Sequence, residues 1–251
     1  NSEGGDFDFD ALRASTRAAW EQALGAVDID ATEDMRTSLY TALYHALIAP
    51  SVSGDVDGRY RGPDNQVHTA EGFTFHSSFS LWDTFRAEHP LLTLVQPERR
   101  NADMINSLLA SQRHSPHRIL PVWQFAGQET WTMIGYHAVP VIADAWLKGL
   151  RGFDGNAALD AMIASATYRP YGGLGDYMDL GYAAIDREPE AASKTVEYAY
   201  DDWAMAVLAD AAGAKDDAAA LRMDYLQRWA AHGTALAARA AGAGWTLVTA
   251  R

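Results

Sequence analysis

Apolar residues recur at helical spacing along most of the chain, and no stretch of note alternates apolar and polar residues as a half-buried strand does. The segments with the helical pattern cover residues 9–24, 35–48, 99–112, 131–150, 156–167, 192–212 and 215–241. Thr32 precedes two acidic residues and is typical of a helix N-cap, while Pro140 is expected to kink the helix that contains it. The sequence therefore predicts an all-α fold.

Two long segments interrupt this helical pattern. Residues 51–80 are rich in Gly, Asp and Ser, and residues 168–190 are rich in Gly, Tyr and Asp. Loops of this length are usually functional or disordered, and their aromatic content argues against disorder. Helices that alternate with such loops are typical of a barrel of paired helices, whose site is built from loops at one end.

Charge and composition exclude several functions. The 251 residues carry a formal net charge of −13, which disfavours binding to the phosphate backbone of nucleic acids. The absence of cysteine excludes disulfides, zinc–thiolate sites and cysteine nucleophiles. No apolar run approaches ~18 residues, so no membrane span is expected. The chain begins at Asn1 without Met or a basic and apolar signal sequence, and we interpret it as a processed or trimmed piece of a longer protein.

Two short motifs combine groups that suit a sugar ring. Trp82, Asp83 and Arg86 offer a flat apolar face, an acceptor and a forked donor. The alternative is a core tryptophan beside a local Asp83–Arg86 pair, which i, i+3 spacing on a helix permits. Asp57 and Arg59 lie in the sequence GDVDGRYRG, which lacks the acid ladder of an EF-hand and forms either a simple turn or a binding loop.

Residues 120–145 gather further candidates around a predicted helix start. Gln124, Glu129 and His137 lie in this segment, although a Gln-Glu-Thr sequence before an apolar helix also suits an N-terminal cap. Among the eight histidines, His76 and His137 are the better candidates for a site. There is no Gly-x-Ser-x-Gly, Walker, His-Glu-x-x-His or dinucleotide motif.

The helix predicted over residues 192–212 carries two adjacent acids. Asp201 and Asp202 flank an apolar stripe on opposite sides, so at most one is expected to point into a site. The stripe consists of Val196, Tyr200, Trp203 and Val207. The two acids form either a solvated pair or a site in which a carboxylate beside aromatic rings serves as a general base.

Five sequence segments, taken in order, resemble the catalytic domain of family 92 glycoside hydrolases: TALYHALIAPSVSGDVDGRYRG, FSLWDTFRAEHPLLTLVQPER, the block from Trp123 to Ala145, DAWLKGLRGFD and SKTVEYAYDDWA. The resemblance is clearest over residues 38–213 and fades beyond them. It implies a calcium-dependent exo-α-mannosidase that inverts the anomeric configuration, with an N-terminal β-sandwich and an (α/α)6 barrel.

The resemblance also implies how the chain relates to the whole enzyme. Residues 1–251 would form part of the (α/α)6 barrel, with residues 214–251 as a helical continuation. The β-sandwich and the remaining barrel segments would be partners outside this chain. The family also implies a secreted or extracytoplasmic location.

The resemblance further implies a Glu as general acid and Asp201 or Asp202 as general base, with Asp201 preferred. Inversion requires the acid and base to stand ~6.5–9.5 Å apart. Trp82, Asp83, Arg86, Asp57, Arg59, His76 and Trp123 are expected to bind substrate or order loops. The calcium ligands are not assigned.

The acid position departs from the family pattern. Relatives carry Trp-Glu-Leu where this chain has Trp123, Gln124 and Phe125, so Gln124 would replace the acid. A phosphate monoester can leave without a proton, and a neutral amide does not repel it, unlike a carboxylate. The resemblance thus favours the branch that cleaves mannose-α-1-phospho-6-mannose. The alternatives are a conventional exo-α-1,2-mannosidase with Glu129 as acid, and an inactive carbohydrate-binding fragment.

Overall fold

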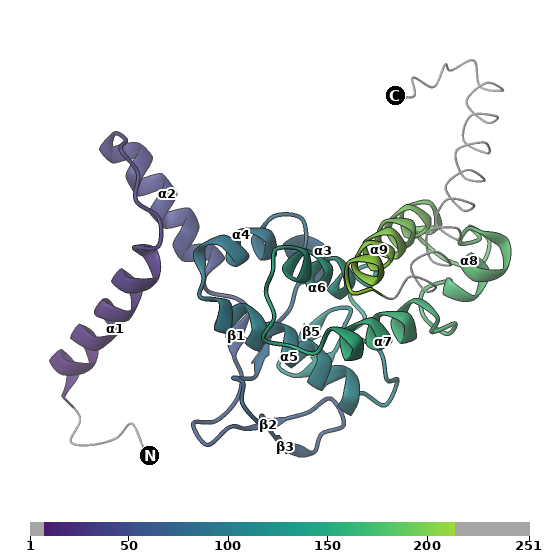
Figure 1. Ribbon diagram of the computed structural model, residues 1–251, viewed down its shortest axis with the longest axis horizontal. Helices are drawn as coiled ribbons and strands as arrows, with labels where there is room; N and C mark the ends of the chain where they lie inside the picture. The colour runs from purple at the N-terminus through teal and green to yellow at the C-terminus, as the bar shows by residue number, and fades with distance from the viewer. Residues whose placement is uncertain (1–7, 214–251) are drawn as a thin grey trace.

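The computed structural model describes residues 8–213 and confirms that this part of the chain is rich in helices (Figure 1). The nine helices of the described part are α1 (Phe9–Leu24), α2 (Glu33–Ala46), α3 (Leu81–Thr84), α4 (Glu88–Val95), α5 (Glu98–His114), α6 (Ala138–Leu147), α7 (Gly155–Ala166), α8 (Leu174–Leu180) and α9 (Ala191–Ala211). The helix expected over residues 215–241 and the continuation over 214–251 lie outside the described residues. No helix between residues 8 and 213 is both long and apolar enough to cross a membrane.

The amphipathic helix α6 lies at the centre of the core. Seven of its ten residues are buried, which agrees with its almost continuous apolar sequence. It packs most extensively against α9 and also contacts α4, α5 and α7. Leu108 of α5, Ile142 of α6 and Met205 of α9 are fully or almost fully buried in this core. Each such side chain stabilises the fold by about 1.5–3 kcal/mol relative to an exposed one.

Helices α1 and α2 form an arm beside this core, drawn in purple in Figure 1. Asp8 caps α1 by accepting hydrogen bonds from the Asp10 and Ala11 backbone N–H groups. Thr32 caps α2 through the Met35 N–H at 3.4 Å, which confirms the predicted N-cap. No residue of α1 is buried, so this helix depends on its contacts with α2 and the core for stability.

Three two-stranded antiparallel ladders lie in segments for which the sequence predicts no helix. Their strands are β1 (Ser51–Val52) with β4 (His76–Ser77), β2 (Arg59–Arg61) with β3 (Val67–Thr69), and β5 (Gln124–Phe125) with β6 (Gln128–Glu129). Strands of two or three residues are too short for an alternating pattern to appear. The all-α prediction therefore missed them, although the fold remains dominated by helices.

The prediction of one helix over residues 131–150 is wrong in its first part. Trp131, Met133 and Gly135 have positive φ angles of 57°, 66° and 81°, which no right-handed helix allows. Helix α6 begins only at Ala138, so Pro140 lies in its first turn. In the first turn of a helix the backbone N–H groups have no partner within the helix, so the N–H that proline lacks is not missed there. Pro140 therefore gives no reason for the expected kink.

Candidate functional site

The two acids of α9 point into the protein. Asp201 is fully buried and Asp202 is 4% exposed, whereas Tyr200 and Trp203 of the apolar stripe are 41% and 43% exposed. The prediction of a solvated acidic pair is therefore wrong. The expectation that at most one of the two acids points inward is wrong as well. Because α6 and α7 pack on the opposite side of α9, the stripe forms the outer face and both carboxylates face the core.

Asp201 belongs to a line of alternating charges. Its Oδ1 lies 2.8 Å from Nδ1 of His137, and its Oδ2 accepts the Tyr136 backbone N–H at 2.9 Å. Nε2 of His137 lies 2.7 Å from a Glu197 carboxylate oxygen. Glu197 in turn accepts a hydrogen bond from the Arg86 guanidinium at 3.0 Å. The array Arg86–Glu197–His137–Asp201 thus runs from the surface to the fully buried carboxylate.

The charges of this array shift the pKa values of its members. Burial lowers the pKa of His137, but the charge and hydrogen bond of Asp201, together with Glu197, outweigh burial and raise it to about 9. Burial raises the pKa of Asp201, although His137 and the Tyr136 N–H oppose the shift. Burial also raises the pKa of Glu197, but His137 and Arg86 outweigh it and leave the value lowered. We therefore take His137 to be an imidazolium at neutral pH.

Asp202 is held by tyrosine hydroxyl groups. Tyr136 Oη donates to Oδ1 at 2.7 Å, and Tyr177 Oη donates to Oδ2 at 2.9 Å. Tyr136 also stacks on Tyr198, with ring centroids 5.3 Å apart. Tyr136, which lies in the segment before α6, thus contacts both acids. Its backbone N–H binds Asp201 and its hydroxyl group binds Asp202. Residues 131–137 are not helical, and this course of the backbone is compatible with both contacts.

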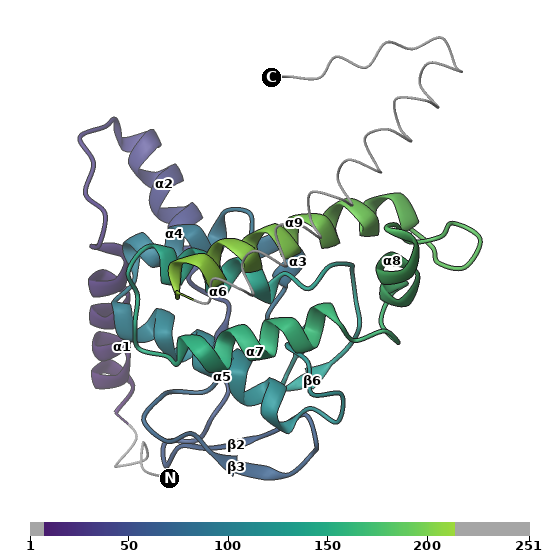
Figure 2. The same cartoon turned by 45° about the vertical axis from the view of Figure 1, so that its right-hand side comes forward.

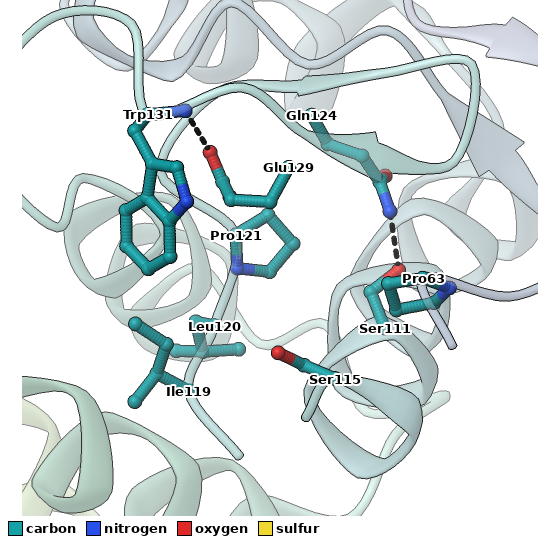
Figure 3. Close-up of a pocket in the computed structure, with 9 residues that line it drawn as sticks. All are labelled: Pro63, Ser111, Ser115, Ile119, Leu120, Pro121, Gln124, Glu129 and Trp131. Carbon is teal, nitrogen blue, oxygen red and sulfur yellow. Dashed lines mark hydrogen bonds between the residues drawn. The ribbon is translucent and has the colours of Figure 1, made fainter. Parts of the chain in front are cut away.

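Gln124 and Glu129 are paired positions of the β5–β6 hairpin, and Figure 3 shows their side chains directed toward Ser111 and Trp131, respectively. The Gln124 amide nitrogen donates to Ser111 Oγ at 2.8 Å and to the Gly127 carbonyl at 3.3 Å. The Glu129 carboxylate accepts the backbone N–H groups of Val122, Trp123 and Trp131 at 2.7, 3.0 and 2.8 Å. Glu129 is therefore not a helix cap, because it lies in β6 and ties the hairpin to its flanking segments. The small cavity that the two residues border has room for about one water, ≈10 Å³.

A larger pocket of ≈400 Å³ opens beside this hairpin. Its lining includes Trp131, Tyr168 and Tyr171 together with the ion-paired side chains of Glu188 and Lys194. Aromatic faces with a few polar groups are typical of sugar-binding pockets. Sequence reasoning did not single out these residues, although the Gly/Tyr-rich composition of residues 168–190 was a signal for them.

Hydrogen bonds link this pocket to the buried acids. Tyr171 Oη donates to the Gly135 carbonyl at 3.0 Å. Gly135 precedes Tyr136, which contacts both Asp201 and Asp202. Tyr198 of α9 donates to the Gly172 carbonyl at 2.8 Å. The pocket wall and the acids therefore share one rigid support.

Other predicted residues take different places. The local Asp83–Arg86 pair does not form: Asp83 is exposed, while Arg86 pairs with Glu197 and lies over the Trp82 ring at 5.1 Å. Glu197 is the better partner because it is half-buried and already bonded to the charged array. Trp123 is half-buried, and its backbone N–H binds Glu129.

Three predicted residues lie away from α9. Asp57 and Arg59 form an exposed ion pair of 2.6 Å within one turn next to β2. His76 is buried in β4, where Nδ1 lies 2.8 Å from the Thr74 carbonyl oxygen. Figures 1 and 2 draw the β2–β3 hairpin at the lower edge of the molecule and α9 in its upper half, with α5 and α7 between them. The structure therefore does not bring the Asp57–Arg59 turn to the buried acids.

Calcium prefers six to eight oxygen ligands, usually including several carboxylates. Within residues 8–213, three or more potential ligand atoms of Asp, Glu and His come together only in a cluster that contains two histidines. The oxygens of Asp201 and Asp202 accept hydrogen bonds from His137, Tyr136 and Tyr177. Among the Asp, Glu and His side chains of residues 8–213, no group of three oxygen ligands comes together.

Carboxylates and an aromatic pocket are groups that a glycoside hydrolase uses. The sequence model described as the Glycosyl hydrolase family 92 catalytic domain matches residues 1–247. The chain belongs to this family.

Solved structures agree with this assignment. The family 92 α-mannosidase BT3965 from Bacteroides thetaiotaomicron is 44% identical with a TM-score of 0.84, over 89% of this chain and 30% of that one. The inverting mannosidase BT2199 from the same species is 31% identical with a TM-score of 0.78, over 90% and 31% of the two chains.

A curated relative is also similar. An uncharacterized secreted glycosidase from Arthroderma benhamiae is 24% identical over 229 residues, which are 84% of this chain and 25% of that protein. The chain thus spans about a quarter to a third of the length of these relatives.

Proposed function

We propose that this chain supplies part of the catalytic domain of an inverting glycoside hydrolase that releases α-linked mannose. The observation that carries the proposal is the buried array of Glu197, His137 and Asp201 beside an aromatic pocket. Two similar structures are named as an α-mannosidase and an inverting mannosidase, and the first was also solved with mannoimidazole. Remaining barrel segments of an (α/α)6 barrel and a β-sandwich would complete the enzyme, and the secreted relative supports an extracytoplasmic location.

In this proposal Asp201 is the general base. A base needs a raised pKa and a fixed orientation, and Asp201 has both through its burial and its bonds to His137 and Tyr136. It also has to reach a water, so the proposal requires that the completed site opens onto this carboxylate. Asp202 is the alternative base, positioned by Tyr136 and Tyr177.

We further propose that the favoured substrate is the mannose-α-1-phospho-6-mannose diester. Gln124 supports this choice because its surroundings suit an amide: its NH₂ group donates to two acceptors, and its carbonyl lies 3.4 Å from the Ser77 hydroxyl. An amide has no proton to give to a poor leaving group, whereas a phosphate leaves without one. Glu129 is the weaker acid candidate because both of its oxygens hold backbone N–H groups.

Calcium is part of the proposal through the family alone. Its ligands are not assigned, and backbone and amide carbonyl oxygens are candidates together with carboxylates. When bound, the ion would hold and polarise sugar hydroxyls. If EDTA leaves turnover unchanged, calcium has no part in the reaction.

A carbohydrate-binding role without catalysis is the second candidate. The ≈400 Å³ pocket with Trp131 and Tyr171 favours it, because aromatic rings can bind a sugar without any reaction. Mannose binding without turnover, with the remaining family segments supplied, would support this role over the enzyme.

Turnover of the diester and of α-1,2-mannobiose by the same protein tests the substrate. We expect the wild type to prefer the diester. Gln124→Glu should increase mannobiose turnover by ~10²-fold or more, the usual contribution of a general acid. Glu129→Gln is the matched change on the paired strand. We expect this variant to keep the preference for the diester over mannobiose. A wild type that prefers mannobiose, and loses that activity in Glu129→Gln, would make Glu129 the acid.

A further inference from the structure

A cluster of metal-ligating side chains lies where the β2–β3 hairpin meets the C-terminal end of α5. Asp64 lies in the hairpin turn, His68 in β3, and His114 is the last residue of α5. One ligand atom from each side chain lies within 4.8 Å of the other two. His68 Nε2 is 3.0 Å from both oxygens of Asp64. Two segments far apart in the sequence thus converge on one point.

The surrounding residues support this cluster. A Cβ added to Gly62 would lie 2.7 Å from the His68 ring and 2.8 Å from Asp64 Oδ1, so the approach leaves no room for a side chain there. The Gln66 N–H donates to Asp64 Oδ1 at 3.0 Å and orients the carboxylate, as outer-shell groups of metal sites do. Next to the cluster, the Tyr60 ring lies 5.8 Å from that of His68.

The two histidine rings stack with centroids 3.5 Å apart and an interplanar angle of 19°. An imidazole binds a metal through a lone pair in the plane of its ring, so one of the two stacked rings has to rotate before both nitrogens can bind one ion. Both histidines and Asp64 are half-buried, which allows an ion to enter from solvent.

We propose that Asp64, His68 and His114 bind a divalent transition-metal ion of the Zn²⁺ type. Two imidazoles and one carboxylate suit zinc, which in many sites has three protein ligands and a water, whereas calcium prefers oxygen ligands only. The ion would tie the β2–β3 hairpin to the end of α5. Arg113 and Arg118 oppose a cation here, so we expect a chelator to remove it readily.

Titration of the chelator-treated full chain with Zn²⁺ tests the site. We expect one ion per chain, visible absorption bands of low-coordinate Co²⁺ when cobalt replaces zinc, and a Tm that rises by roughly 5–10 °C at ~100 times Kd. His114→Asn and His68→Asn should each lower zinc affinity on the order of 100-fold. His45→Asn, an exposed histidine of α2, is the matched control and should retain it.

Three results would overturn the proposal. They are a wild type that binds no zinc, ligand variants that bind it as tightly as the wild type, and an equal loss in His45→Asn. Circular dichroism checks that each variant folds. If His68→Asn does not fold, then His114→Asn at the helix end and the cobalt spectrum of the wild type decide. The response of Tm to Ca²⁺ should be the same in the wild type and His114→Asn.

Discussion

His137 occupies an unusual position for a side chain that is 1% exposed. It lies between the carboxylates of Asp201 and Glu197, and its ring stacks on Phe85 with centroids 4.1 Å apart. A buried cation with two anionic partners is held firmly, whereas removal of the cation leaves buried charges unpaired. His137 therefore determines the charge and orientation of the proposed base.

The pH dependence of stability tests this role. The folded pKa of about 9 lies above the unfolded value near 6.5, so the contribution is complete below about pH 6.5 and is lost as pH rises through 9. The difference in unfolding free energy between the wild type and His137→Gln should narrow by about 3 kcal/mol from pH 6.5 to above pH 9. Urea unfolding at a series of pH values measures it. A difference that does not change with pH would contradict a charged His137.

Glu88 is a carboxyl group in an unfavourable place. Burial, and then the charge of Asp83, raise its pKa to about 7. Because the folded value exceeds the unfolded one, stability is lost as pH rises through 7. Glu88→Gln should therefore increase the unfolding free energy by about 1–3 kcal/mol at pH 8 and change it little at pH 4. The exposed Glu71→Gln is the control, and an equal gain from both changes would refute the assignment.

Long helices could be predicted from the sequence because periodicity persists over many residues. The structure begins and ends α1 at the predicted residues and places α9 one residue earlier than predicted, at Ala191–Ala211. Prediction failed for residues 131–137. They are not helical, and Tyr136 among them contacts acids about 65 positions away. Helix periodicity contains no information about such tertiary contacts.

The β5–β6 hairpin depends on its two-residue turn. Ala126 and Gly127 have φ angles of 48° and 79°, and a Cβ on Gly127 would lie 2.9 Å from the Arg61 carbonyl oxygen. Gly127→Ala should cost about 2–4 kcal/mol, since backbone strain of about 1–2 kcal/mol and the clash add up. Gly149→Ala has a similar positive φ but no atom within 4 Å, so it should cost only the strain. Equal losses of Tm would show that the contact with Arg61 is unimportant.

At the scale of the whole molecule, the chain presents an unusually apolar outer face on α9. Val196, Tyr200 and Trp203 are 53%, 41% and 43% exposed on the side opposite the acids. The chain spans about a quarter to a third of the length of its relatives. From the sequence, the family and the two acids of α9 were identifiable because their motif is local. The charged array with Glu197 and the aromatic pocket could not be identified from the sequence. Their residues come together only when segments that are distant in the sequence pack against each other.

The central claim is that a carboxylate of α9 activates water for attack on mannose. The most direct test is the rate of mannose release by Asp201→Asn and Asp202→Asn in the protein that carries all family segments, with the product anomer followed by NMR. We expect the wild type to release β-mannose, and at least one of the two variants, Asp201→Asn by preference, to lose ~10²–10⁴-fold in kcat with its fold retained. If both variants retain wild-type turnover, or if α-mannose is released first, neither carboxylate is the base of an inverting reaction.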